Sequence, residues 1–312
     1  MEKIKVMTVG SAYMELSMNT YRVPNPGETV EDDGGVAYIP GGSAVRVGVA
    51  LSRLGAESRI TARLGRDIHG QKLYRYFGEL GITTDTVKVD NDMQTGLSVL
   101  IKETGAPARS IVYPGASGAL SVLDIGDALD TCPTAVCLCP DISEELINAA
   151  ASSSAVSNIP VFVCAERARS DFDFSTLPGV DVFVTNIDCA ERMSGIRPTG
   201  ADASLRAALA IFKSVSCKYL VIRQGERGAF IYDGKHYYMI PAINAGKPVD
   251  TGVATEAFFA GLVIRYILGG GDMKSAVQYG SVVSAIAVTK GGGLSALPTE
   301  GEVISFLEKY TG

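Results

Sequence analysis

The region from about 159 to 225 alternates strand-like and helix-like segments, and this alternation constrains the fold more than any other feature. Apolar runs at 159–166 and 180–186 are followed by a helical pattern at 201–213 and another strand-like run at 217–225. Strands that alternate with helices favour a mainly parallel sheet with helices on both faces. The sequence therefore predicts a three-layer α/β/α fold, in which ligands bind at the carboxyl ends of the strands.

Two segments interrupt this alternation, at about 11–39 and about 90–113. In the second, the strand-like runs GLSVLIKE and RSIVYPG flank a turn at 104–107, so we expect the two segments to form a small sheet of their own. A chain of 312 residues that is 46% apolar can bury a full core. Because the sequence has no internal repeat or long linker, we predict a single domain over 1–312 with these segments as excursions from it.

Charge and hydropathy exclude several classes of protein. The net charge is −6 and no run of Lys or Arg would follow a phosphate backbone, so a nucleic-acid partner is not expected. The N-terminus resembles a first strand rather than a signal peptide. The apolar run at 257–270 is interrupted by Arg265, well short of the roughly 20 residues that cross a bilayer, and is predicted to be a buried helix. We therefore expect a cytoplasmic protein without membrane contacts.

Three of the six cysteines, Cys132, Cys137 and Cys139, cluster in the sequence. They suggest a metal site or disulfides, but the chain has only two histidines, and neither has zinc-site spacing to the cluster. Buried thiols in a reducing compartment are the favoured interpretation. His69 and His236 are expected to be structural or exposed.

A Gly-Gly pair, Gly41 and Gly42, precedes a predicted helix that Ser43 would cap and Gly55 would end. Its apolar residues follow helical i, i+3, i+4, i+7 spacing: Val47, Ala50, Leu51 and Leu54. Glycines at the start of a helix allow the backbone to approach a ligand closely, although such a pair also forms ordinary turns. The pattern G-x-D-x-x-G follows at 65–70.

The Gly-Gly helix followed by G-x-D-x-x-G resembles the N-terminal signature of the ribokinase-like (PfkB) carbohydrate kinases. Further segments match in the family's order: PGETV at 26–30, YPGAS at 113–117, TN at 185–186, RQGERG at 223–228, DTGVATEAFFAG at 250–261 and VTKGGGLSALPT at 288–299. The resemblance covers nearly the whole chain. It implies a ribokinase-like α/β domain that binds ATP and a sugar at the strand ends, and a β-sheet lid over the sugar. It also implies a homodimer formed through the lids.

The turn before the predicted helix 254–268 differs from the family where the chemistry occurs. The family reads roughly Asp-Thr-x-Gly-Ala-Gly-Asp, and this chain has Asp250, Thr251, Gly252, Val253, Ala254, Thr255 and Glu256. The resemblance implies that Glu256 is the base, that the backbone at 253–255 forms the anion hole, and that Asp250 binds the sugar. Glu256 is longer by one methylene, and a misplacement of about 1 Å costs about 10²-fold in rate. The β-branched Thr255 is expected to narrow the anion hole.

Other implied ligand positions differ too. Arg46 replaces a sugar-binding Asn, and either pairs with an acidic substrate group or points to solvent; Glu15 replaces a sugar-binding Asp, and Gly41 and Gly42 complete the substrate set. Cys189 replaces the Glu that helps to organise Mg²⁺, which leaves Asn186 and Asp188 as candidate ligands. The implied nucleotide-binding positions are Asn186, Arg223, Gly225, Gly228, Thr251 and Gly293. A monovalent cation near Asp250 is a further implication.

Two classes of function follow. The first is an ATP-dependent phosphotransferase that acts on a hydroxyl of a sugar or related polyol, with a nucleoside kinase as a narrower alternative. The second is a catalytically impaired or silent relative that binds nucleotide, sugar or a partner protein, because the base, the anion hole, the Mg²⁺ motif and the sugar Asn are all altered.

Overall fold

The computed structural model describes residues 3–32 and 34–311, and within them nine strands form one large sheet. The strand order is β13-β12-β11-β10-β9-β8-β1-β4-β5; strands β5 to β11 along this order pair in parallel, and β12 and β13 extend the edge as an antiparallel hairpin. The bounds are β1 (Lys5–Val9), β4 (Glu57–Gly65), β5 (Val87–Asp90), β8 (Ala135–Leu138), β9 (Val161–Cys164), β10 (Val180–Asn186), β11 (Cys217–Arg223), β12 (Ala229–Tyr232) and β13 (Tyr237–Ile240). Strands β8 and β9 are buried throughout, as continuous apolar runs in parallel sheets are.

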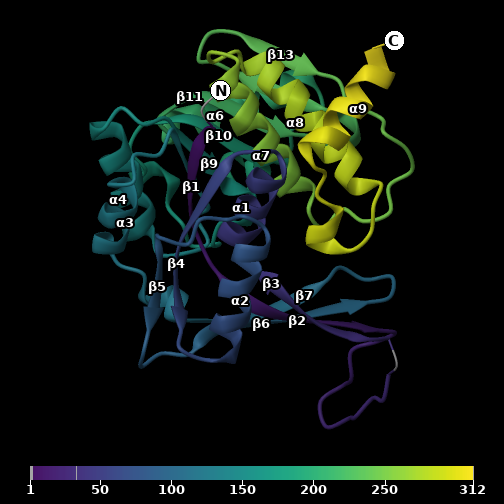
Figure 1. Ribbon diagram of the computed structural model, residues 1–312. Coiled ribbons are helices and arrows are strands. Elements are labelled where there is room, and N and C mark those ends of the chain that lie inside the picture. The colour runs from purple at the N-terminus through teal and green to yellow at the C-terminus, as the bar shows by residue number, and fades with distance from the viewer. Residues whose placement is uncertain (1–2, 33, 312) are drawn as a thin grey trace.

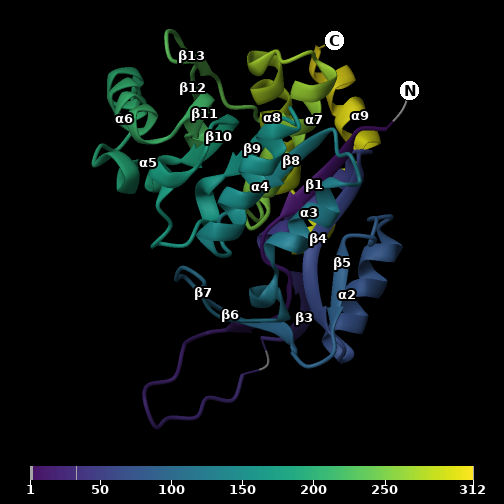
Figure 2. The same ribbon diagram turned by 90° about the vertical axis from the view of Figure 1, so that its left-hand side faces the viewer.

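Helices cover both faces of this sheet, which confirms the predicted three-layer architecture (Figures 1 and 2). One face packs against α1 (Ser43–Arg53), α2 (Ile68–Glu79), α7 (Ala254–Leu268), α8 (Met273–Val288) and α9 (Glu300–Thr311). The other face packs against α3 (Val122–Leu129), α4 (Glu144–Val156), α5 (Ile187–Ser194) and α6 (Ala201–Ser214). The sheet therefore separates two hydrophobic cores.

Helix α7 is the buried helix that the sequence predicted at 254–268. Most of its side chains are buried between the large sheet and α8, which explains why it is apolar on nearly all sides. Among the described residues, no helix is long and apolar enough to cross a membrane. The first turn of α7 follows directly on the loop at 250–253, so the fold places that turn at one edge of the core.

A second sheet has the order β3-β2-β6-β7 and lies to one side of the large sheet, with α2 against β2 (Figure 1). Its strands are β2 (Tyr13–Thr20), β3 (Val36–Gly41), β6 (Thr95–Glu103) and β7 (Arg109–Gly115). Strands β2 and β6 pair in parallel, and each also pairs antiparallel with its hairpin partner. This small sheet is built from the two segments that interrupt the strand–helix alternation.

The two N-terminal motifs have structural roles in joining the sheets. Asp67 caps α2 by accepting a hydrogen bond from the Gly70 amide at 2.8 Å, and its other oxygen accepts one from the Thr95 amide at 2.8 Å. Gly42 caps α1 at φ +99°, where an added Cβ would lie 2.2 Å from the Ser11 carbonyl oxygen. The prediction that Ser43 caps this helix is wrong, because Ser43 is already helical and its amide binds the Ser11 hydroxyl at 3.1 Å.

Candidate active site

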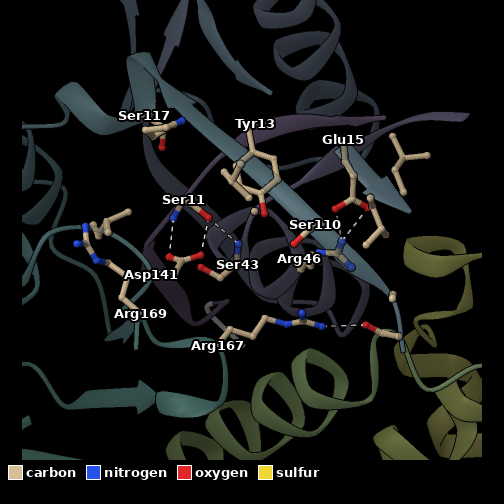
Figure 3. A pocket seen from close by; sticks show the side chains of 18 of the residues that line it. Ser11, Tyr13, Glu15, Ser43, Arg46, Ser110, Ser117, Asp141, Arg167 and Arg169 are labelled. Carbon is tan, nitrogen blue, oxygen red and sulfur yellow. Dashed lines mark hydrogen bonds and ion pairs between the residues drawn. The ribbon is translucent and has the colours of Figure 1, made fainter. Parts of the chain in front are cut away.

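A cavity of about 950 Å³ lies between the small sheet and the carboxyl ends of the large sheet's strands (Figure 3). Five segments outside the small sheet line it: the residues after β1, the start of α1, the loops after β8 and β9, and the turn before α7. The small sheet contributes alternate residues of β6 and β7. A site at this edge agrees with the position that the α/β architecture predicts for a ligand.

The predicted substrate residues Glu15 and Arg46 form an ion pair in this wall. One terminal nitrogen of Arg46, Nη2, lies 3.1 Å from each carboxylate oxygen of Glu15, and both side chains are mostly buried. The alternative in which Arg46 points to solvent is wrong, because its side chain is 13% exposed and bound to Glu15. Pairing of Arg46 with an acidic substrate group stays a prediction. Tyr13 lines the cavity nearby, and burial raises the pKa of its hydroxyl to about 12.

Asp141 is a wall residue that the sequence reasoning missed. Its carboxylate accepts hydrogen bonds from the amide of Ser11, at 3.0 Å, and from the Ser11 hydroxyl (Figure 3). Burial raises the pKa of Asp141 above its ordinary value, and the hydrogen bonds of Ser11 and Ser43 oppose that shift. The available signal was its position, because Asp141 is the first acidic residue after a fully buried strand, β8.

Glu256, the predicted base, lies in the first turn of α7 and is held by Arg167, which the sequence reasoning also missed. Arg167 Nε is 2.7 Å from Glu256 Oε1, and its Nη2 donates to the Gly252 carbonyl at 3.2 Å. The Glu256 side chain is 2% exposed, whereas that of Arg167 is 47% exposed and lines the cavity. Glu256 Oε2 is buried without a hydrogen-bond partner among the described residues. The neighbouring Glu256 carboxylate raises the pKa of Arg167.

Thr255 belongs to a second set of contacts, centred on Glu166. The Thr255 hydroxyl donates to Glu166 Oε2 at 2.8 Å and accepts from Arg223 Nη1 at 2.9 Å. Arg223 Nη1 also lies 2.9 Å from both Glu166 oxygens, and the Asn186 carboxamide donates to Oε2 at 3.2 Å. The network brings together Asn186, Arg223 and Thr255 from the predicted set. It also fixes the direction of the Thr255 hydroxyl.

The first turn of α7 supplies amide donors. The Ala254 amide is bound by the Thr251 carbonyl at 3.1 Å and the Ala257 amide by the Val253 carbonyl at 3.0 Å. The amides of Thr255 and Glu256 lie between them, in the turn where N–H groups have no carbonyl of their own helix to bind. Asp250, Thr251 and Gly252 line the cavity directly, whereas Val253 is buried.

The candidate metal ligands are not brought together. Asn186 Oδ1 accepts the Cys189 amide at 2.9 Å and so caps α5, while Asp188 is exposed and pairs with Arg197 at 3.0 Å. No group of three or more His, Cys, Asp or Glu side chains in the described residues is arranged to hold a metal. Cys189 itself is buried.

The predicted glycines fall into two groups. Gly42 and Gly293 line the cavity, and Gly41 precedes Gly42 at the end of β3. Gly225 and Gly228 flank the short turn between β11 and β12, where an added Cβ on Gly228 would lie 1.9 Å from the Ile240 carbonyl oxygen. The hairpin therefore requires a glycine at 228 whatever else this residue binds, whereas Gly225 has φ +59° and no atom within 4 Å of an added Cβ.

The cysteine prediction is correct in part. Cys137, Cys139, Cys164 and Cys189 are buried free thiols, and burial raises the pKa of each. For Cys132 the prediction is wrong: this residue lies in the exposed turn after α3, with φ +54°. Cys132 differs from Cys137 because it lies in the surface turn before β8, whereas Cys137 lies within that buried strand.

Comparisons with known proteins agree with this geometry. Residues 3–300 match the family described as pfkB family carbohydrate kinase. Ribokinase of Haemophilus influenzae is 25% identical, over 97% of this chain and 99% of that protein. The structure of ribokinase from Giardia lamblia matches with a TM-score of 0.88 at 21% identity, covering 99% of this chain and 100% of that one. Arabidopsis thaliana ribokinase complexed with ribose and ATP matches with a TM-score of 0.83 at 19% identity, covering 98% and 99%. The chain therefore belongs to the pfkB family of carbohydrate kinases.

Proposed function

We propose that the chain transfers the terminal phosphoryl group of ATP to a hydroxyl of a sugar or related polyol bound in the cavity. One observation carries this proposal: the cavity wall includes the turn at 250–252 and Arg167, which holds the carboxylate of Glu256. The first turn of a helix, a carboxylate and a cavity with room for a sugar thus meet at one edge of the sheet. The match to a ribokinase solved with ribose and ATP supports the same two substrates.

In the proposed reaction, Glu256 accepts the proton of the attacking hydroxyl. The hydroxyl oxygen then forms a bond to the terminal phosphorus, and the bond from that phosphorus to the leaving ADP oxygen breaks. The unpaired amides at the start of α7 stabilise the charge on the transferred group, because such amides and the helix dipole favour anions. Positioning and electrostatic stabilisation supply most of the catalysis of phosphoryl transfer.

The described residues do not offer a ligand set for Mg²⁺. Asn186 Oδ1 is used in capping α5, and Glu166 is already hydrogen-bonded to Arg223, Thr255 and Asn186. We therefore assign no step to a protein-held metal.

A monovalent cation near Asp250 stays a prediction. The Asp250 carboxylate accepts a hydrogen bond from the Gly252 amide at 2.8 Å. Cytoplasmic localisation likewise stays a prediction.

A silent binding protein is the second candidate, and one specific observation favours it. The carboxylate of Glu256 is almost fully buried beneath a paired guanidinium, so a substrate hydroxyl does not reach it in this conformation. On this alternative, nucleotide and sugar bind without turnover. Nucleoside kinase activity is a narrower form of the first candidate, since a nucleoside also presents a ribose hydroxyl.

We also propose a homodimer through the outer face of the small sheet, meaning the face turned away from the cavity. Large apolar side chains are exposed there or beside it: Val36, Tyr38, Ile68, Ile111 and Tyr113. Exposed apolar side chains on one face of a sheet favour association. Sedimentation velocity checks this proposal: a dimer is expected, and Ile111→Lys should give monomers. A wild-type monomer at micromolar concentration would contradict it.

The function is tested by ADP release from magnesium-ATP in the presence of a panel of sugars, polyols, nucleosides and sugar acids. We expect at least one sugar or polyol to stimulate ADP release above the substrate-free rate. Stimulation by nucleosides but not by free sugars would indicate the narrower nucleoside kinase activity. ATP binding without stimulation by any member of the panel would contradict the kinase proposal and support the silent alternative.

A further inference from the structure

Arg167 has an unusual position between the catalytic turn and the cavity. It is the last residue of the short 3₁₀ helix η2 (Ala165–Arg167), which follows directly on β9. Its guanidinium binds both the carbonyl of Gly252 and the carboxylate of Glu256. Its side chain is half exposed and lines the cavity (Figure 3). The cation thus lies beside the first turn of α7, where the phosphoryl group is proposed to bind.

This contact is incompatible with catalysis unless it is broken. Glu256 is absent from the cavity wall, whereas Arg167 is part of it, so the guanidinium separates the base from the cavity. Only one oxygen of Glu256 is bound by Arg167, and the other has no partner among the described residues. An anion placed near Gly252 competes for the guanidinium, because Arg binds phosphate oxygens as well as carboxylates.

The other arginines near the cavity are less suited to respond to such an anion. Arg46 is held by Glu15, and Arg223 is held by Glu166 and Thr255. Arg169 pairs with Asp171 two residues away, and no hydrogen bond joins it to the turn before α7 in the described residues. Arg167 therefore combines contact with the catalytic turn and exposure to the cavity.

We propose that Arg167 is a catalytic residue that moves from Glu256 to the terminal phosphoryl group of the bound nucleotide. This inference rests on the proposed kinase function. The move uncovers the base only when the phosphoryl donor is present, and it brings a positive charge to the transferred group. A cation of this kind would compensate for the narrower anion hole that the sequence predicts at Thr255. An arginine that stabilises the transferred phosphoryl group is a general solution in phosphoryl-transfer enzymes.

The test compares binding of ADP with binding of the non-hydrolysable β,γ-imido analogue of ATP, by calorimetry. If Arg167 contacts the terminal phosphoryl group, Arg167→Gln should weaken analogue binding about 10-fold or more and leave ADP binding unchanged. Arg167→Lys should retain part of the preference for the analogue, because it keeps the charge. Equal affinity of wild type and Arg167→Gln for the analogue would overturn the inference.

Arg63→Gln is a matched control. Arg63 Nη2 lies 2.7 Å from the buried carboxylate of Asp124, so this change also leaves a buried acid without its guanidinium, but outside the cavity wall. It should not alter the ratio of the two affinities, and the same loss in Arg63→Gln would overturn the inference. The double variant Arg167→Gln with Glu256→Gln leaves no unpaired buried charge at the site, and it too should lose the preference for the analogue.

The binding test does not require turnover, so the two proposals fail separately. An Arg167-dependent preference for the analogue in a protein that phosphorylates nothing would support the contact between Arg167 and the phosphoryl group, and would contradict both the kinase and a catalytic role for Arg167. Sugar-dependent ADP release together with unchanged analogue binding in Arg167→Gln would support the kinase and contradict the inference.

Discussion

Two arginine–carboxylate pairs lie at different parts of the same cavity, Arg46–Glu15 and Arg167–Glu256. They differ in how deeply the arginine is buried and in how many carboxylate oxygens it contacts. In the pair Arg46–Glu15 the side chains are 13% and 4% exposed, and one guanidinium nitrogen contacts both carboxylate oxygens. In the pair Arg167–Glu256 the arginine is 47% exposed and contacts a single oxygen. The first pair is enclosed and serves as a fixed wall. In the second pair the Arg167 guanidinium can move into the cavity, as it must if its contact with Glu256 breaks during the reaction.

The largest expected effect comes from removing the base of the second pair. Glu256→Gln should lower kcat about 10²–10⁴-fold with the best sugar of the panel, because general-base catalysis contributes about that much. ADP release at saturating substrate measures it. Unchanged kcat would show that Glu256 is not the base, and a correctly folded variant is established by its unaltered ADP affinity.

The two pairs should differ in their effect on stability. Arg46→Ala leaves Glu15 buried without its cation, and breaking a buried pair in this way costs about 3–5 kcal/mol. Arg167→Ala should cost less, because the guanidinium is half exposed and water can enter its place from the cavity. Thermal unfolding of both variants checks the order. A larger loss of Tm in Arg167→Ala would contradict the distinction between a fixed and a movable pair.

A smaller effect is expected from Asp141, which lies in the fixed wall. Its pKa is raised in the folded protein, so its contribution to stability is complete below the unfolded pKa and is lost as pH rises through the folded value. Asp141→Asn should therefore reduce the loss of stability as pH rises above the acidic range. Denaturant unfolding of the wild type and of Asp141→Asn between pH 3 and 7 measures the difference. The two free energies of unfolding should diverge with pH by on the order of 1 kcal/mol for each unit by which the folded pKa exceeds the unfolded pKa. Parallel pH profiles would contradict the assignment.

The smallest effect is expected at Thr255, whose hydroxyl joins Arg223 to Glu166. Thr255→Val keeps the shape but removes this hydroxyl, and Arg223 still holds Glu166. A loss of about 1 kcal/mol in the free energy of unfolding is expected. Thr255→Ser is the matched control and should retain the hydrogen bonds. A large loss in the serine variant would show that the methyl group, rather than the hydroxyl, is important.

The sequence predicted the fold, both members of the pair Arg46–Glu15, and one member of the pair Arg167–Glu256. The strand–helix alternation and the motif order predicted the layers, and the helix predicted at 254–268 after the catalytic turn has the bounds of α7. Glu15, Arg46 and Glu256 were predicted site residues, since motifs place them. Arg167, Glu166 and Asp141 were missed because they act through tertiary contacts: Arg167 lies 89 positions from Glu256 in the sequence, and Ser11 lies 130 positions from Asp141. Local periodicity does not report contacts between loops at different strand ends.

A crystal structure with the β,γ-imido analogue of ATP would test the difference between the two pairs most directly. The expected result is the Arg167 guanidinium within hydrogen-bond distance of the terminal phosphoryl oxygens, Glu256 open to the cavity, and Arg46 still on Glu15. A structure in which the analogue is bound while Arg167 remains on Glu256, without contact to the phosphoryl group, would contradict the account.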